Sequence, residues 1–491
     1  MTTSPNNKTH RASRVGLALA GVLAIVVSAG CGGSDDAGGG RQAGIEGTGI
    51  VSGFGSVYID GTEFDTDAAT IRFVGEDVPV SRLSVGDRVA VTGTLDRDGN
   101  ARAERIVFQR TLDGPIERIE TDGERGTLVA LEQTVHFDGD TVFVNTPAAE
   151  LAVGDLIAVS GFTQTENRVQ AESIRQSETG FVPNDSTLEI EGRVDRIDGT
   201  QLAVGDQTID FANAEVRPAG ATLNTNSRIE AFGTRGASRS DALIASRINI
   251  TSLNTAPAGR QMLVGAAIDD YSSASDFVAG NWRIDASGAQ RLDDGTTALA
   301  PGVVVSVRGV FENNRVKART LRVEPRSNAM LEARIESTDA DSLTLLGRTI
   351  GVSADTGYID NSATGDRTLR LDTLAPGDPV RVQAYVDGDD NTATARSIER
   401  VSADQADAAA IAGAVTSTAR SGTGATLVVA GVSARLDDAT TSYQDANGNA
   451  VEAQTFYNAV DAGARVRLTG PQNGDRISIV RRARILLDAA G

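Results

Sequence analysis

Two short turns carry oxygen-bearing side chains at a spacing that could hold a metal ion. The candidate ligands are Asp96, Asp98, Asn100, Asp445, Asn447 and Asn449, in the segments DRDGN and DANGN. Calcium prefers six to eight oxygen ligands of these types. In DRDGN, however, glycine stands fourth rather than sixth, and Asp, Asn and Gly are also what hairpin turns require. We interpret both segments as plain turns, keep an array that binds a small ligand or calcium as the alternative, and expect no metal or other cofactor.

Residues that usually carry catalysis are scarce in this chain. It has two histidines, His10 and His136, and one cysteine, Cys31. We find no nucleophile elbow, no phosphate-binding glycine loop and no paired-histidine zinc motif. The 66 acidic residues are too many for any one carboxylate pair to stand out. We therefore expect a protein that is not an enzyme, and rank an enzyme with an unrecognised site third.

The N-terminus has the organisation of a secretory signal peptide. Lys8, Arg11 and Arg14 precede an apolar run over residues 15–27, which is too short to span a bilayer and ends close to Cys31. The segment VSAGC resembles the lipobox of bacterial lipoproteins, which implies acylation of Cys31, for example by palmitate. Glycine rather than aspartate follows Cys31, and the resemblance to sorted lipoproteins then implies the outer membrane, on its periplasmic or surface face.

Net charge restricts the partners that we expect. The formal charge of the chain is −20 and only 4% of its residues are aromatic. Such a surface repels phosphate backbones and offers few stacking platforms, so no nucleic acid is expected. The expected partners are the membrane, through the N-terminal lipid, and other envelope proteins or polysaccharide.

One eleven-residue segment is written six times, as LSVGDRVAVTG at 83–93 and LAVGDLIAVSG at 151–161, with four more divergent copies. Its shared turn position is occupied by Gly86, Gly154, Asn226, Gly302, Gly377 and Gly463. Glycine and asparagine both tolerate positive φ, whereas the acid that follows in two copies is not shared by all six. The pattern therefore indicates a structural joint rather than a repeated binding site.

Each joint belongs to a larger repeat that must position it. A short opening strand is followed by a hairpin, such as SVYIDGTEFDT with Asp60 and Gly61 at its turn, then a connector, the joint and two strands. Five strands with a connector after the third match the OB-fold barrel. We predict an all-β chain of six tandem small five-stranded OB-like barrels after a lipoprotein signal peptide. The predicted segments are a signal peptide (1–30), a lipidated tether (31–43), and repeats at 44–110, 111–177, 187–251, 260–325, 329–402 and 409–488.

The residues quoted above carry a family resemblance. GTGIVSGFGSVYIDGTEFDT at 47–66, with LSVGDRVAVTGTL and ARAERIVF after it, resembles the repeat of bacterial lipoproteins known as domain of unknown function 5666. The likeness is greatest in the first unit, less in the second and least in the later four. It implies a secreted, lipid-anchored, repeat-built β protein, and it supplies no activity or functional residues.

The expected function is that of a lipid-anchored envelope protein acting as a non-catalytic binding or spacer module. Polar or proline-bearing segments separate most of the units, and each barrel would close its own sheet. We therefore expect an extended string of separate barrels, with a radius of gyration near 45 Å rather than the roughly 23 Å of one globule. The sequence does not name the ligand or the oligomeric state.

Overall fold

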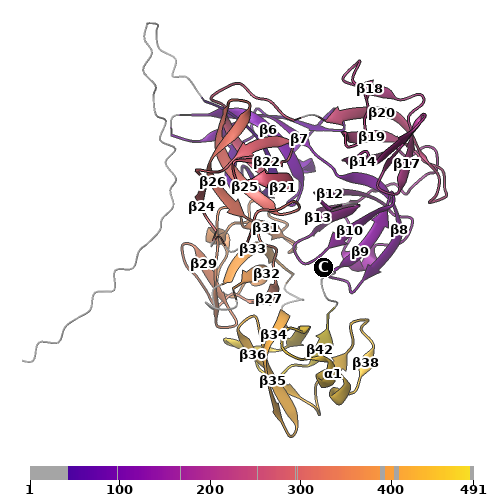
Figure 1. Cartoon of the computed structure of the whole chain (residues 1–491). Coiled ribbons are helices and arrows are strands. Elements are labelled where there is room, and N and C mark those ends of the chain that lie inside the picture. Colours follow the sequence, from indigo (N-terminus) through magenta and orange to yellow (C-terminus); the bar gives the residue numbers. More distant parts are fainter. Residues whose placement is uncertain are drawn as a thin grey trace, which may run out of the picture.

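The computed structural model describes residues 43–486, apart from 97, 166, 252, 294, 296, 388–392 and 403–407. The described residues form repeated small β-barrels, which confirms the all-β, OB-like fold class (Figure 1). Among them, no helix has the length and apolar character needed to cross a membrane.

The first three barrels occupy the N-terminal half of the described chain. Barrel 1 contains β1 (Ala43–Gly53), β2 (Val57–Ile59), β3 (Thr62–Asp65), β4 (Thr70–Phe73), β5 (Glu76–Val78), a 3-10 turn (Val80–Arg82), β6 (Arg88–Leu95) and β7 (Ala101–Phe108). Barrel 2 contains β8 (Leu112–Thr121), β9 (Gly126–Ala130), β10 (Gln133–Phe137), β11 (Val142–Val144), a 3-10 turn (Ala148–Glu150), β12 (Leu156–Thr165) and β13 (Arg168–Gln176). Barrel 3 contains β14 (Leu188–Arg193), β15 (Arg196–Asp198), β16 (Gln201–Val204), β17 (Gln207–Asp210), β18 (Glu215–Arg217), β19 (Arg228–Thr234) and β20 (Leu243–Thr251).

The other three barrels follow in the same order. Barrel 4 contains β21 (Gln261–Ser273), β22 (Asp276–Ala279), β23 (Trp282–Asp285), β24 (Gln290–Arg291), β25 (Val304–Glu312) and β26 (Arg315–Val323). Barrel 5 contains β27 (Ala329–Arg334), β28 (Ser337–Thr338), β29 (Ser342–Leu345), β30 (Arg348–Gly351), β31 (Gly357–Asp360), a 3-10 turn (Leu371–Thr373), β32 (Pro379–Val386) and β33 (Ala393–Arg400). Barrel 6 contains β34 (Ala409–Ser421), β35 (Gly424–Val429), β36 (Val432–Asp437), β37 (Ser442–Gln444), β38 (Ala450–Val451), α1 (Ala453–Ala459), β39 (Arg465–Gly470), β40 (Gln472–Asn473), β41 (Arg476–Ile477) and β42 (Arg482–Ile485).

The strand order is that of an OB-fold. In barrel 1, β1, β2 and β3 form an antiparallel meander, β3 runs parallel to β7, and β6 pairs with both β7 and β1, which closes the sheet. Barrels 2 and 4 close in the same order. The connector after the third strand contains a 3-10 turn in barrels 1, 2 and 5 and the helix α1 in barrel 6.

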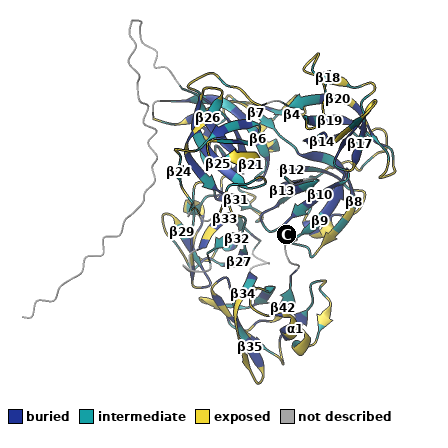
Figure 2. Ribbon diagram, viewed as in Figure 1, coloured by how far each residue is buried: buried dark blue, intermediate teal, exposed yellow. Residues whose placement is uncertain are grey.

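Local sequence explains the tight hairpin between the second and third strands. Asp60 and Gly61 both have positive φ, +46° and +66°, as the predicted two-residue turn requires. Val57 and Ile59 point into barrel 1 and are almost fully buried, while Tyr58 between them faces outward. In Figure 2, buried residues gather in the strands of the barrels and exposed residues at many loop tips.

The barrels are joined in pairs through their opening strands. β1 of barrel 1 runs parallel to β21 of barrel 4, β8 of barrel 2 pairs antiparallel with β14 of barrel 3, and β27 of barrel 5 pairs antiparallel with β34 of barrel 6. Each pair of barrels therefore shares one continuous sheet of 13 or 14 strands.

The opening strand of barrel 4 can pair in this way because both faces of its paired segment are apolar or small. On β21, Val264 packs in the core of barrel 4, whereas its neighbour Leu263 packs in the core of barrel 1. Gly47 on β1 lies directly against the backbone of Leu263, and a Cβ at this position would collide with the Leu263 carbonyl group. The glycine therefore permits the close parallel pairing of barrels 1 and 4.

The expected string of separate barrels is wrong. Besides the shared sheets, buried ion pairs connect units that are distant in sequence. Arg326, between barrels 4 and 5, donates to Asp138 and Glu172 of barrel 2 at 2.6 Å, and Arg396 of barrel 5 also pairs with Glu172. Barrels 1 to 5 cluster together in Figure 1, and barrel 6 projects from barrel 5. Strand alternation indicates which residues face outward, but not that those residues meet complementary charges on other barrels.

Candidate functional site

The six joint residues have one backbone conformation. Their φ values lie between +70° and +97°, in the left-handed region that glycine and asparagine tolerate best. Each joint N–H donates a hydrogen bond of 2.7–2.9 Å to a carbonyl of its own barrel's first strand or the residue after it. The donors are Gly86, Gly154, Asn226, Gly302, Gly377 and Gly463, and the acceptors are Val51, Ile116, Val194, Ile268, Ile335 and Val415. The repeated segment thus fastens the connector to the opening strand.

The hydrogen bonds of the residue after the joint explain why the type of that residue varies among the barrels. Asp87, Asp155, Ser227 and Asp378 each accept a hydrogen bond, through the side-chain oxygen, from the backbone N–H three residues earlier, at 2.7–3.1 Å. A serine hydroxyl therefore does in barrel 3 what an aspartate does elsewhere. This is a turn-stabilising contact, and it uses the oxygen that a repeated ligand site would need.

The two oxygen-rich turns have the contacts of ordinary turns. The Asp96 carboxylate accepts hydrogen bonds from the backbone of Asp98 and from the backbone and side chain of Asn100. Asp445 accepts from the backbone and side chain of Asn449 in the same way, at 2.8 and 3.1 Å. These bonds lower the pKa of both exposed aspartates. The turns belong to barrels 1 and 6 and are not brought together, and the lipidation candidate Cys31 lies outside the described residues.

Elsewhere in the molecule, a cavity between barrels is lined by charged side chains. Barrels 1, 2, 4 and 5 surround a central cavity of about 390 Å³. Its apolar wall includes Ile50, Val142, Phe162 and Val304, one or two side chains from each of three barrels. Six carboxylates also line it, namely Asp60, Asp140, Glu172, Asp293, Glu324 and Asp355, together with the guanidinium groups of Arg322 and Arg396. No sequence pattern marks this cavity because its walls come from four repeats.

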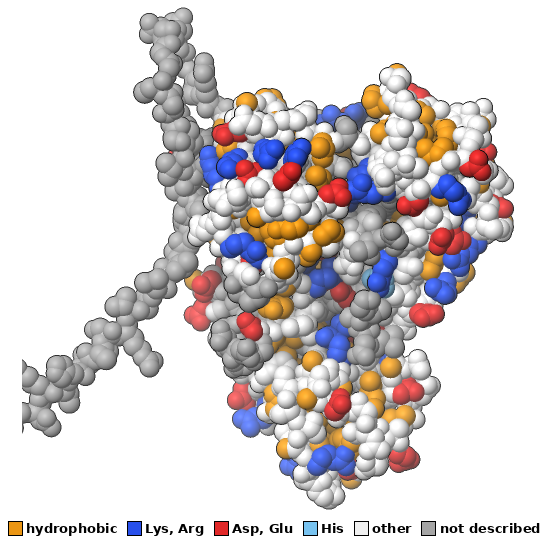
Figure 3. Space-filling view, viewed as in Figure 1, with side chains coloured by type: hydrophobic (Ala, Val, Ile, Leu, Met, Phe, Trp, Pro, Cys, Tyr) orange, Lys and Arg blue, Asp and Glu red, His pale blue; other side chains and the backbone are white. Residues whose placement is uncertain are grey.

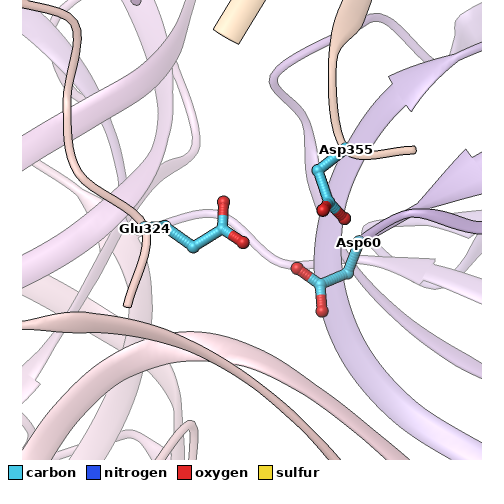
Figure 4. Close-up of side chains that lie close together, drawn as sticks. All are labelled: Asp60, Glu324 and Asp355. Atoms are coloured by element: carbon cyan, nitrogen blue, oxygen red, sulfur yellow. The ribbon is translucent and has the colours of Figure 1, made fainter. Parts of the chain in front are cut away.

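Three of these carboxylates converge on one point (Figure 4). Asp60 is the first turn residue between β2 and β3, Glu324 directly follows β26, and Asp355 lies between β30 and β31. One oxygen of each lies within 4.8 Å of the others. The approach is close enough that a side chain at Gly61 would collide with the Asp355 carboxylate. Glycine at position 61 therefore serves both the turn and the contact between barrels 1 and 5.

Asp60 is the most enclosed of the three. Its Oδ2 atom accepts a 2.6 Å hydrogen bond from the Ser306 hydroxyl, and its carbonyl accepts one of 2.9 Å from Arg308. Burial and the nearby charge of Glu324 raise the pKa of Asp60 to about 6, against the lowering effects of Ser306 and Arg308. Asp60 is thus an acid whose ionisation is disfavoured unless positive charge approaches.

Arg322 is the cation in direct contact with the other two carboxylates. It pairs with Asp355, and its Nε lies 3.4 Å from Glu324 Oε1. The second Glu324 oxygen is 3.9 Å from Arg396, which is engaged mainly with Glu172 and Asp140 of barrel 2. Burial raises the pKa of Asp140, although Arg396 and Arg326 lower it.

Several oxygens around this cavity have no hydrogen-bond partner within the described part of the chain. They are Ser52 Oγ, Asp140 Oδ1, Glu324 Oε1 and Asp355 Oδ1, and each atom is enclosed. Buried polar atoms without partners are uncommon because each costs about 1–3 kcal/mol. The cavity therefore holds acceptor capacity that the protein itself does not use.

No sequence pattern identifies the cluster of three carboxylates. The sequence identifies Asp60 only as a turn residue, and neither Glu324 nor Asp355 belongs to a motif. Tyr58 faces outward on β2, and the Arg370 guanidinium of barrel 5 covers its ring, 4.0 Å from the centroid. Outward-facing positions of a barrel can be recognised from alternation, whereas the neighbour that covers them cannot.

Comparison with known proteins supports the repeat assignment. The family model "Domain of unknown function (DUF5666)" matches residues 47–107, 113–175 and 332–399, which confirms the resemblance and places copies in barrels 1, 2 and 5. No curated protein matches the chain. A solved structure, "drosophila Unr CSD456", is 16% identical over 44% of this chain and 100% of its own, with a TM-score of 0.14, too low to bear on fold or function.

Proposed function

We propose that this protein, three of whose barrels are DUF5666 domains, is an exported envelope lipoprotein that acts as a non-catalytic binding module. Its ligand would occupy the central cavity between barrels 1, 2, 4 and 5. The observation that carries the proposal is the set of enclosed, unpartnered oxygens on the walls of that cavity. A spacer would need no such cavity, and its barrels would gain length by remaining apart.

The residues around the cavity support a binding role over a catalytic one. The described lining residues include no histidine, cysteine or lysine, and four of the lining carboxylates, Asp140, Glu172, Glu324 and Asp355, are paired with Arg322 or Arg396. The fixed shared sheets and inter-barrel ion pairs hold the walls in place, which favours a preformed site.

The expected partners do not include nucleic acid. On the face shown in Figure 3, basic and acidic side chains are interspersed and no broad basic patch forms. The formal charge of −20 also opposes association with a phosphate backbone. The membrane would be the partner of the lipidated N-terminus, with envelope proteins or polysaccharide as further candidates.

Native mass spectrometry on protein purified from its own envelope tests the binding function. We expect the wild-type chain to carry a non-covalent adduct that Val142→Trp, which fills the cavity, removes. Val153→Trp is the matched control because Val153 is 64% exposed and lies outside the cavity lining. A wild-type chain without any adduct, or one whose adduct survives Val142→Trp unchanged, would refute the cavity as the binding site.

A further inference from the structure

The convergence of Asp60, Glu324 and Asp355 matches the geometry of a metal-ion site. Calcium binds oxygen ligands at about 2.3–2.6 Å, so two oxygens on opposite sides of one ion lie roughly 4.6–5.2 Å apart. The three carboxylate oxygens here lie within 4.8 Å of one another. They come from barrels 1, 4 and 5, so an ion between them would connect three units of the assembly.

A second observation also points to a ligand. Ser52 is only 8% exposed, and its hydroxyl has no hydrogen-bond partner among the described residues. Ser52 lies at an irregularity of β1, between Val51 and Gly53, and it lines the same cavity. A hydroxyl so enclosed needs a bound water or ion to satisfy it.

We propose that Asp60, Glu324 and Asp355 bind a hard divalent cation of the calcium type in the central cavity. The donor set contains only oxygen, which such ions prefer over the nitrogen and sulfur ligands of zinc or copper. Asp355 Oδ1 has no hydrogen-bond partner in the described structure, and Glu324 Oε1 has only the 3.4 Å ion-pair contact with Arg322. The inference rests on the proposed function in that the ion is the ligand, or part of the ligand, of the same cavity.

Arg322 has a distinct role in this proposal. It contacts both Asp355 and Glu324, so it acts as an internal counter-ion that the cation must displace. Its removal should therefore strengthen cation binding. If the carboxylates were only members of a structural ion-pair network, removal of Arg322 would lower stability and produce no binding.

Isothermal titration of the chelator-treated, unlipidated mature chain with calcium chloride tests the site. We expect saturable binding to the wild type, at least about tenfold weaker binding to Asp355→Asn and Glu324→Gln, and binding several-fold tighter to Arg322→Gln. Asp96→Asn is the matched control because Asp96 lies in an exposed turn, and its affinity should equal that of the wild type. Circular dichroism and melting temperature verify that each variant is folded.

Absence of saturable heat in both the wild type and Arg322→Gln would overturn the cation site. So would calcium binding that Asp96→Asn weakens while folded Asp355→Asn and Glu324→Gln do not. A native adduct lost in Val142→Trp, with no calcium binding, would refute only the cation and leave the binding function. If calcium binds while the native chain carries no adduct, the cation site stands and the proposed physiological ligand binding fails.

Discussion

The Ser306 hydroxyl donates a 2.6 Å hydrogen bond to the carboxylate of Asp60, although 246 positions separate the two residues. Asp60 is a hairpin-turn residue of barrel 1, and Ser306 lies on β25 of barrel 4. A turn that would be exposed on an isolated barrel is thus covered by another repeat. Contacts between repeats likewise form the central cavity and determine the shape of the molecule.

The first prediction compares two joint glycines with the same backbone conformation. Gly86 and Gly154 have φ of +88° and +97°, so alanine should cost about 1–2 kcal/mol of unfolding free energy at either position. A Cβ at Gly86 would also lie 2.6 Å from the Glu172 carbonyl of barrel 2, whereas nothing lies within 4 Å at Gly154. Gly86→Ala should therefore be more destabilising than Gly154→Ala in chemical denaturation. Equal losses would show that the contact between barrels 1 and 2 does not form.

The second prediction concerns pH and the sheet shared by barrels 2 and 3. Glu189 on β14 accepts a hydrogen bond from Arg110, yet burial and three neighbouring acids raise its pKa to about 7, above the ordinary 4.5. Folding therefore favours the protonated form. This contribution to stability is fully present below about pH 4 and is lost as pH rises through 7.

Glu189→Gln should remove that loss, because glutamine does not ionise. The difference in unfolding free energy, variant minus wild type, should be about 1–3 kcal/mol larger at pH 8 than at pH 4. Melting curves across this range measure the effect, with the exposed strand residue Glu104→Gln as the control. Parallel stability curves for Glu189→Gln and the wild type would contradict the prediction.

The third prediction is the size of the molecule in solution. Shared sheets join the barrels in pairs, and inter-barrel ion pairs connect those pairs. Small-angle scattering of the unlipidated mature chain should give a radius of gyration of about 25–30 Å, only slightly above the scaling for one compact domain of this length. A radius of gyration near 45 Å would contradict this prediction and support an extended string of separate barrels.

The fourth prediction concerns the N-terminal anchor. The lipobox-like VSAGC, with its single cysteine, predicts that Cys31 is acylated and holds the protein at a membrane. Cys31→Ser should abolish fatty-acid labelling and move the protein to the soluble fraction, without a change in its melting temperature, because residue 31 precedes the first barrel. Absence of label on the wild type would rule out the lipoprotein assignment.

The sequence by itself determined the barrel and its turns. Gly86 and Asn226 could be identified as positions of positive φ because backbone sterics act within a few residues and leave the same trace in every copy. Val57 and Ile59 could be placed inside barrel 1 because strand alternation is also local. Asp60 and Gly61 could be recognised as a turn for the same reason.

Only the tertiary structure decided how the barrels meet. Gly47 against Leu263, and Asp60 beside Glu324 and Asp355, are contacts between repeats that no local pattern specifies. The separating segments are polar, which is consistent either with free linkers or, as in Arg326, with a partly buried arginine among carboxylates of another barrel. The free energy of such pairs depends on which charges are brought together out of water, and that is a property of the assembled surface rather than of any segment.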